Sequence, residues 1–216
     1  MYILGLTGGM ASGKTTVAGF LKACGAAIVD ADKIVHDLQQ AGTEETKIIA
    51  DKLGKNVLNE EGGLSRPALA AAIQADKSVL TFLEDVLHPA VRREELNQLK
   101  AAANTGHGVA ILDIPLLFET EAHLLSDGVA VCHSPLEVRK ERAFARPGMN
   151  EDKWKNLLAR RWDDAKMLQH ADFVIDTNTT LPETKEQVQS LYEHIVETLD
   201  AEFSADAAWP QKWAAM

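Results

Sequence analysis

The residues whose types and spacing most directly suggest chemistry lie near the N-terminus, from Gly8 to Thr15. They read Gly-Gly-Met-Ala-Ser-Gly-Lys-Thr and match the pattern G-x-x-x-x-G-K-[ST]. The backbone N–H groups of such a loop, together with the positive end of the helix that follows, bind phosphate oxygens. The glycines allow the backbone to approach a phosphate closely. The pattern therefore predicts a loop that binds the phosphates of a nucleotide.

The side chains of this loop have separate expected tasks. Lys14 is expected to contact the β- and γ-phosphates, and the Thr15 hydroxyl is expected to ligate Mg²⁺. The other positions expected to surround the nucleotide are Gly9, Ala11, Ser12, Gly13 and Thr16. A chance match in a glycine-rich turn is the alternative, and the apolar segment before the loop and the helical pattern after it argue against that reading.

A carboxylate, Asp113, follows the apolar segment 109–112, where a strand is expected to end. An acidic side chain at such a place could hold Mg²⁺ directly or through water. It could also simply cap the next turn of the chain, and the spacing alone leaves both interpretations open.

Two further carboxylates, Asp30 and Asp32, follow the apolar segment 26–29. Alternate residues of an extended chain point the same way, and ligands of open α/β sheets bind beyond the carboxyl ends of the strands. Both carboxylates could therefore face a substrate, and one could accept a proton from a substrate hydroxyl. We favour Asp32 as that base and Asp30 as the cap of a helix beginning near Lys33.

Basic residues gather in two further places. Arg139, Arg142 and Arg146 share one face of an expected helix. They could close over a nucleotide and neutralise developing charge, or they could form a solvated basic face. His88-Pro89 could belong to a basic patch for an anionic substrate, although its spacing favours a helix interrupted by proline.

Short apolar segments separated by helical patterns determine the expected fold. Strands are expected at 2–6, 26–29, 109–112, 128–132 and 173–175. Helices are expected at 14–23, over most of 33–107, and at 136–145, 151–170 and 183–199. The first strand, helix and second strand form a βαβ unit, so the sheet begins parallel. This order predicts an α/β protein with the three-layer P-loop NTPase fold and a five-stranded, mainly parallel sheet.

Composition excludes several classes of protein. The chain has 216 residues, with 22 Lys and Arg against 32 Asp and Glu, which gives a net charge of −10. We expect no nucleic-acid partner, because the bulk positive field that neutralises phosphates is missing. No apolar run reaches the roughly 20 residues of a membrane helix, and the first residues do not resemble a signal peptide. We therefore expect a cytoplasmic protein without membrane contact. The histidines lack the spacing of metal ligands, so a metal site built from protein side chains alone is not expected.

At several segments the chain resembles the dephospho-CoA kinase family. The matching segments are 6–17, 29–34, 63–66, 83–89, 113–119 and 171–176, together with Arg142 and Arg146. The segment 113–119, Asp-Ile-Pro-Leu-Leu-Phe-Glu, is the most specific, because few other phosphate-loop kinases carry it. The resemblance covers residues 2–200 and leaves out a tail at 201–216.

The resemblance implies that ATP and Mg²⁺ are used to phosphorylate the 3′-hydroxyl of dephospho-CoA, the last step of coenzyme A biosynthesis. It implies one kinase domain over 1–200, in which 33–107 is largely a CoA-binding region and 136–170 forms a lid with flanking helices. The sequence leaves the oligomeric state open, and we favour a monomer. The implied catalytic residues are Asp32, Lys14 and Arg142. Those implied for ATP include Arg146 and Asn178, and those implied for the substrate are Asp32, Arg66, His88, Leu116 and Phe118.

The chain departs from the family pattern at four positions. Ala11 stands where glycine is usual, and Arg161 stands where glutamine is common. Met167 stands where the family has a basic residue, and Thr179 stands where the family frequently has glycine. Two other functions stay open on the residues alone: a small-molecule kinase for a nucleotide or sugar, and a regulator that only binds nucleotide. The guanine-recognition pattern N-K-x-D of many such regulators is absent from the sequence.

Overall fold

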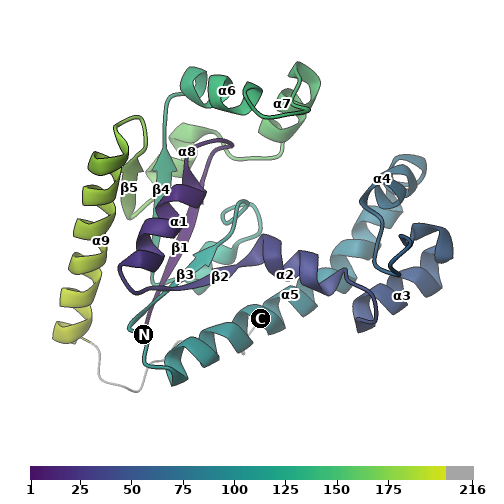
Figure 1. The fold of residues 1–216 in the computed structure, drawn as a ribbon, viewed down its shortest axis with the longest axis horizontal. Coiled ribbons are helices and arrows are strands. Elements are labelled where there is room, and N and C mark those ends of the chain that lie inside the picture. Colours follow the sequence, from purple (N-terminus) through teal and green to yellow (C-terminus); the bar gives the residue numbers. More distant parts are fainter. Residues whose placement is uncertain (203–216) are drawn as a thin grey trace. The chain divides into compact units, whose positions relative to one another are not determined.

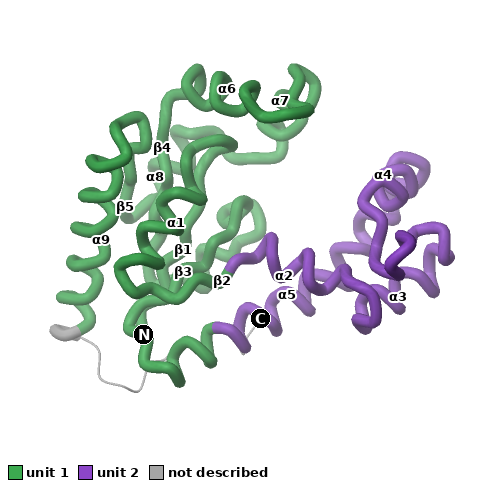
Figure 2. Tube along the Cα trace, in the orientation of Figure 1, with its two compact units in different colours: residues 1–29, 99–216 green, residues 30–98 purple. Residues whose placement is uncertain are grey.

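The computed structural model describes the backbone of residues 1–202 and the side chains of residues 1–199. These residues form two compact units, shown in different colours in Figure 2. The first consists of Met1–Val29 and the chain from Leu99 onward, and the second is Asp30–Gln98. Apart from the last turn of a helix, the tail at 201–216 lies outside the described residues.

The first unit is built on a five-stranded sheet with the order β2-β3-β1-β4-β5 (Figure 1). The strands are β1 (Tyr2–Gly8), β2 (Ala27–Asp30), β3 (Val109–Asp113), β4 (Gly128–His133) and β5 (Phe173–Asp176). β1 runs parallel to both β3 and β4, and β4 runs parallel to β5. All five expected strands are present, and the predicted α/β fold with its parallel sheet is confirmed.

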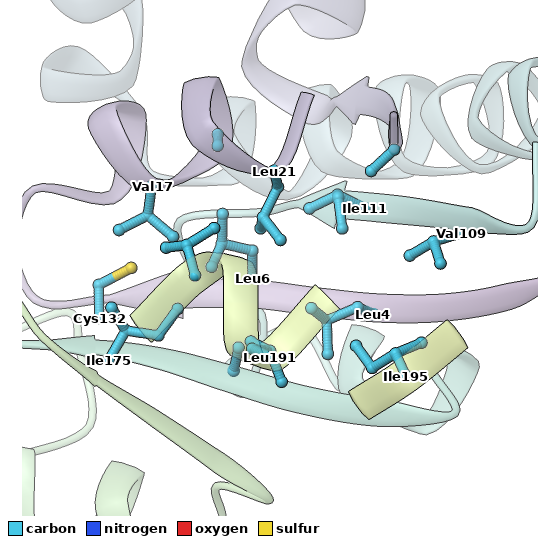
Figure 3. Close-up of a cluster of buried hydrophobic side chains, with 14 residues drawn as sticks. Leu4, Leu6, Val17, Leu21, Val109, Ile111, Cys132, Ile175, Leu191 and Ile195 are labelled. Carbon is cyan, nitrogen blue, oxygen red and sulfur yellow. The ribbon is translucent and has the colours of Figure 1, made fainter. Parts of the chain in front are cut away.

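One face of the sheet is covered by α1 (Lys14–Ala23) and α9 (Leu181–Glu202). Figure 3 shows their side chains meeting those of the strands, with Leu6 of β1 close to Val17 of α1 and Leu191 of α9. A parallel sheet is buried on both faces, so its strands are continuous apolar runs. That is the physical reason why the strand segments stand out in the sequence.

The segment 151–170, which was expected to be a single helix, is interrupted. Helix α7 (Glu151–Leu158) ends, a non-helical segment follows, and a second helix, α8 (Asp164–Gln169), begins. The Asp163 side chain accepts a hydrogen bond from the Lys166 backbone N–H at 2.7 Å and so caps α8. A strong N-cap restarts a helix, and the periodicity of apolar residues does not reveal it.

The second face of the sheet is covered by shorter segments of the same unit. The 3₁₀ helix η2 (Ala122–Leu125) lies against β1, and α8 lies against β4. Leu117 and Phe118, in the chain between β3 and η2, are buried, with at most 1% of their surface exposed. Helices and turns on both faces of the sheet complete the three layers of the predicted fold.

The second unit is helical. Its elements are α2 (Ala31–Leu38), α3 (Glu44–Leu53), η1 (Lys55–Val57), α4 (Arg66–Ala75) and most of α5 (Ser78–Asn104). Its core holds Ile49, Val57, Leu64, Leu69 and Leu83. α5 continues through Pro89, so the interpretation of that segment as a helix containing proline is confirmed.

A buried carboxylate in α5, paired with a partly exposed arginine, is expected to make the stability of this unit depend on pH. Glu95 is 1% exposed and lies 2.8 Å from Arg92, and burial raises the pKa of its carboxyl despite the opposing effect of Arg92. Below the ordinary glutamate value of 4.5 the group is protonated in both the folded and the unfolded chain. As the pH rises above that value, the unfolded chain releases the proton more readily, so the native state loses stability.

We therefore expect Glu95→Gln to gain stability relative to the natural chain as the pH rises from about 4.5 to about 7. Urea unfolding of both proteins across this range measures the difference. Glu84→Gln, at an exposed position of the same helix, serves as the control and should show no such trend. A constant difference between Glu95→Gln and the natural chain would contradict this account.

Candidate active site

The phosphate loop connects β1 to α1 at the carboxyl edge of the sheet. Gly13 directly precedes α1 and has a φ of 85°, in the left-handed region that glycine tolerates. Ala11 also has a positive φ, of 60°, which costs an L-residue about 1–2 kcal/mol. The loop therefore keeps its shape at Ala11 without the glycine that the family usually has there.

A threonine beyond β5 holds the loop from the side. The Thr177 hydroxyl donates to the Ser12 carbonyl at 2.6 Å and lies 2.9 Å from the His133 carbonyl oxygen. Its backbone N–H also donates to His133, at 2.8 Å. Thr177 is 7% exposed, and its side chain lies against Gly13. One buried hydroxyl thus links the loop to the carboxyl ends of two strands.

Replacing Thr177 by valine keeps its shape and leaves the Ser12 carbonyl without this donor. We expect the free energy of unfolding to fall by about 1–3 kcal/mol and the affinity for ATP to fall with it. Thr198→Val is the matched control, because the Thr198 hydroxyl donates only to its own helix at His194. Urea unfolding and ATP titration of both variants test this, and equal behaviour of the two would contradict it.

Lys14 and Asp113 meet beside the loop as an ion pair. Their side chains are 18% and 10% exposed. The parallel register pairs Asp113 of β3 with Leu6 of β1, which brings the carboxylate to the edge of the sheet where the loop begins. Burial raises the pKa of the neighbouring Cys132 thiol above its usual range, so this side chain stays neutral. Cys132 therefore adds no charge beside Lys14 and Asp113.

The loop region also offers oxygen atoms suited to Mg²⁺. Thr15 is exposed in the first turn of α1, and the Asp113 carboxylate lies next to Lys14. Mg²⁺ prefers oxygen ligands and is commonly held by one or two protein groups together with substrate phosphates. Within residues 1–199, the structure contains no cluster of three His, Cys, Asp or Glu side chains able to hold a metal. A hydroxyl and a carboxylate fit an ion that arrives with a nucleotide.

One buried polar atom of the loop is consistent with a bound anion. Ser12 is 1% exposed, and its Oγ has no hydrogen-bond partner among the described residues. A buried hydroxyl without a partner is costly unless a ligand or water satisfies it. A phosphate oxygen in the loop is a suitable partner.

A cavity of about 410 Å³ lies beside the loop. It is lined by Ala11, Gly13, Thr16, Arg142, Arg146, Thr177, Thr179, Leu181 and Thr184. The cavity thus brings together three positions predicted to surround the nucleotide, Ala11, Gly13 and Thr16. It also includes Arg146, which was predicted to bind ATP, and Arg142, which was predicted to be catalytic. Arg142, from α6 (Leu136–Phe144), is held in place because its Nη2 donates to the Thr177 carbonyl at 2.9 Å. Asn178 is exposed and does not line the cavity, although both of its neighbours do.

The structure separates the roles of the two aspartates after β2. Asp30 precedes α2, and its Oδ1 accepts a hydrogen bond from the Lys33 N–H at 3.0 Å, so the predicted cap is confirmed. The expectation that Asp30 and Asp32 lie on one extended segment is wrong. Asp32 lies in the first turn of α2, where its side chain is exposed. The cap itself explains this, because it starts the helix at Ala31.

The helical unit contains a groove of about 490 Å³ with mainly apolar walls. Arg66 at the start of α4 and His88 in α5 both line it, so two predicted substrate residues share one surface. Leu116 and Phe118 belong to the other unit. Leu116 is half-buried, and Phe118 is 1% exposed and stacks on Trp162 with 4.9 Å between ring centroids. Its ring is therefore part of the interior.

A family model described as dephospho-CoA kinase matches residues 2–183. The chain belongs to the dephospho-CoA kinase family. A dephospho-CoA kinase of Leifsonia xyli is 38% identical over 193 residues, which cover 89% of this chain and 98% of the relative. One of Bartonella quintana is 35% identical over 196 residues, which cover 91% and 99%.

Two solved structures share the fold of this chain, and one of them is a dephospho-CoA kinase. A dephospho-CoA kinase from Campylobacter jejuni has a TM-score of 0.68 at 25% identity, covering 91% of this chain and 98% of its own. The protein TT1252 from Thermus thermophilus has a TM-score of 0.75 at 30% identity, covering 91% and 97%. The predicted family is therefore confirmed.

Among the described helices, none is long and apolar enough to cross a membrane.

Three contacts of this dephospho-CoA kinase family member were not foreseen from its sequence. They are those of Thr177, Arg139 and Arg161. Thr177 could have been found, because it follows an expected strand at the edge where ligands of such sheets bind. The arginine contacts depend on the break between α7 and α8, which the periodicity of apolar residues did not reveal.

Proposed function

We propose that this protein transfers the γ-phosphoryl group of ATP to the 3′-hydroxyl of the ribose of dephospho-CoA, which completes coenzyme A. The observation that carries the proposal is the family match over residues 2–183, which spans both the phosphate loop and the helical unit. The ion pair of Lys14 with Asp113 and the cavity beside the loop support the ATP side of the reaction.

The phosphate loop is proposed to hold the triphosphate. Its backbone N–H groups and the N-terminus of α1 face the phosphate oxygens, and Lys14 neutralises charge on the β- and γ-phosphates. Arg142 and Arg146, on the cavity wall, balance the negative charge that moves toward ADP during transfer. Thr15 and Asp113 would hold Mg²⁺, which supplies further neutralisation of the phosphates when it is bound.

Asp32 is proposed as the general base. Its carboxylate accepts the proton of the ribose 3′-hydroxyl while the oxygen bonds to the γ-phosphorus. The bond between that phosphorus and the oxygen bridging to the β-phosphate breaks, and ADP leaves with its electron pair. The exposed position of Asp32 in the first turn of α2 leaves the carboxylate accessible to a substrate.

The groove of the helical unit is proposed to bind the rest of dephospho-CoA. Apolar walls suit the pantetheine arm, and Arg66 and His88 offer hydrogen-bond donors to the pyrophosphate. We propose a monomer as the working unit. We place the enzyme in the cytoplasm, where ATP is available.

Purified protein with Mg-ATP and a panel of acceptors tests the proposal. ADP release and product mass are recorded with dephospho-CoA, adenosine, AMP and several sugars. We expect turnover with dephospho-CoA alone and the addition of one phosphate. Turnover of a different acceptor would show another small-molecule kinase, and tight ATP binding without any turnover would indicate a regulator.

A further inference from the structure

An arginine from the break between α7 and α8 reaches the start of the phosphate loop. Arg161 Nη1 donates to the Gly8 carbonyl at 2.7 Å and to the Pro115 carbonyl at 2.9 Å. Gly8 is the last residue of β1, and Pro115 follows the end of β3 at Asp113. One guanidinium therefore joins the beginning of the loop to the segment that follows the site carboxylate.

A second guanidinium, that of Arg139 in α6, lies against the next residue of the loop. A Cβ atom built on Gly9 would lie only 1.9 Å from Arg139 Nη1, so the arginine occupies the space beside this glycine. Arg139 is 2% exposed, and its Nε donates to the Ser134 carbonyl at 2.9 Å. Its Nη2 forms an ion pair with Asp164, the first residue of α8.

The two arginines are connected through a short piece of chain. Asp164 is only three residues from Arg161, a stretch that spans at most about 11 Å. Gly9, Arg139, Arg161 and Asp164 all line one cavity, of about 220 Å³. The Arg139–Asp164 ion pair therefore fixes the end of the segment that carries Arg161.

A structural role alone accounts poorly for this arrangement. Removing an arginine from water has a desolvation cost that offsets much of the attraction to its partner, and apolar residues often replace such pairs without loss of stability. Here the guanidinium of Arg139 is buried beside the loop that binds phosphates, while its partner Asp164 is partly exposed. The position of Arg139 indicates a role in the geometry of that loop.

We propose that Arg139 is a positioning residue: its ion pair with Asp164 holds the segment 161–164 so that Arg161 fixes the Gly8 carbonyl and, with it, the phosphate loop. The proposal rests on the proposed function, because the loop is the part of the site that binds ATP. A displacement of about 1 Å in such a loop lowers turnover by up to about 10²-fold.

A double-mutant cycle tests this proposal. Arg139→Met, Arg161→Met and the double variant are compared by kcat and by the dissociation constant of ATP without acceptor. Each single variant is expected to lower kcat about tenfold or more and to weaken ATP binding. The double variant should be no worse than the more harmful single one, because both act through the same contacts. Arg139→Lys should recover part of kcat, since its ammonium can still pair with Asp164.

Two further variants separate the positioning role from an effect on folding and from an unspecific effect of lost charge. Asp164→Asn removes the same ion pair from a side chain that is 32% exposed, so it tests the proposal even where Arg139→Met fails to fold. It is expected to lower kcat as Arg139→Met does. Arg160→Met changes an exposed neighbouring arginine and should leave kcat unchanged.

Either of two results would overturn the positioning role. One is that the losses of the single variants multiply in the double variant. The other is that Arg139→Met and Asp164→Asn lower thermal stability and leave kcat and ATP affinity of the folded protein unchanged. Failure of the proposed function would look different, because the natural chain itself would not phosphorylate dephospho-CoA. The cycle on ATP affinity would then still decide the role of Arg139.

Discussion

Replacing Lys14 by methionine is expected to lower kcat by about 10³-fold in folded protein. The substitution keeps most of the aliphatic chain and removes only the ammonium, which lies beside Asp113 at the edge where the loop begins. Without the ammonium, the negative charge of Asp113 is no longer balanced next to the phosphates. The negative charge on the phosphoryl group during transfer is also less well neutralised. ATP binding should weaken less than kcat falls, because the backbone N–H groups of the loop remain.

Lys22→Met is the matched control for Lys14. Lys22 is exposed in the last turn of the same helix, so its replacement changes the charge of α1 without touching the loop. Its kcat is expected to equal that of the natural chain. Circular dichroism of both variants shows whether the fold is kept. A folded Lys14→Met protein that retains more than about a tenth of the natural kcat would contradict the assignment of Lys14.

The second large effect is expected at Asp32. Asp32→Asn removes the proposed proton acceptor and keeps the size of the side chain, so kcat should fall by about 10²–10⁴-fold. The dissociation constant of ATP should stay the same, because the phosphate loop is unchanged. Steady-state kinetics with dephospho-CoA and an ATP titration measure the two quantities.

Asp30→Asn gives a sharp comparison, since it makes the same chemical change two residues away. Asp30 caps α2, and asparagine caps a helix about as well as aspartate, so kcat should stay close to the natural value. The opposite pattern, with Asp30→Asn inactive and Asp32→Asn active, would assign the base to Asp30. Full activity in both variants would remove the general base from the mechanism.

The sheet and the phosphate loop could be predicted because short-range patterns determine them. Strands buried on both faces are continuous apolar runs, and the spacing from Gly8 to Thr15 specifies the loop. The meeting of Lys14 with Asp113 depends on the pairing of β1 with β3. The rule that ligands bind at the carboxyl ends of strands placed both residues near the nucleotide. It did not predict the ion pair between them.

The rest of the site depends on helix ends and tertiary contacts that the sequence pattern does not display. The Asp163 cap divides the expected helix at 151–170, and that break is where Arg161 turns toward Gly8. The Asp30 cap likewise moves Asp32 from a strand into a helix. In both places an N-capping side chain overrode the pattern of apolar residues.

The roles of Asn178, Arg66 and His88 stay predictions. Arg66 and His88 share a groove, which supports their assignment to the substrate. Asn178 is exposed next to the cavity beside the loop, and its N–H donates to Asp176 at 2.8 Å. Substitution of each, with KM recorded separately for ATP and dephospho-CoA, would assign them to one substrate or the other.

In the proposed reaction, the phosphoryl group of ATP goes to the ribose 3′-hydroxyl of dephospho-CoA. The most direct measurement compares dephospho-CoA with its 3′-deoxy analogue as acceptors for the purified protein and Mg-ATP, with the product masses recorded. We predict that one phosphate is added to dephospho-CoA and none to the analogue. Phosphate transfer to the analogue, or no transfer to dephospho-CoA, would contradict the account.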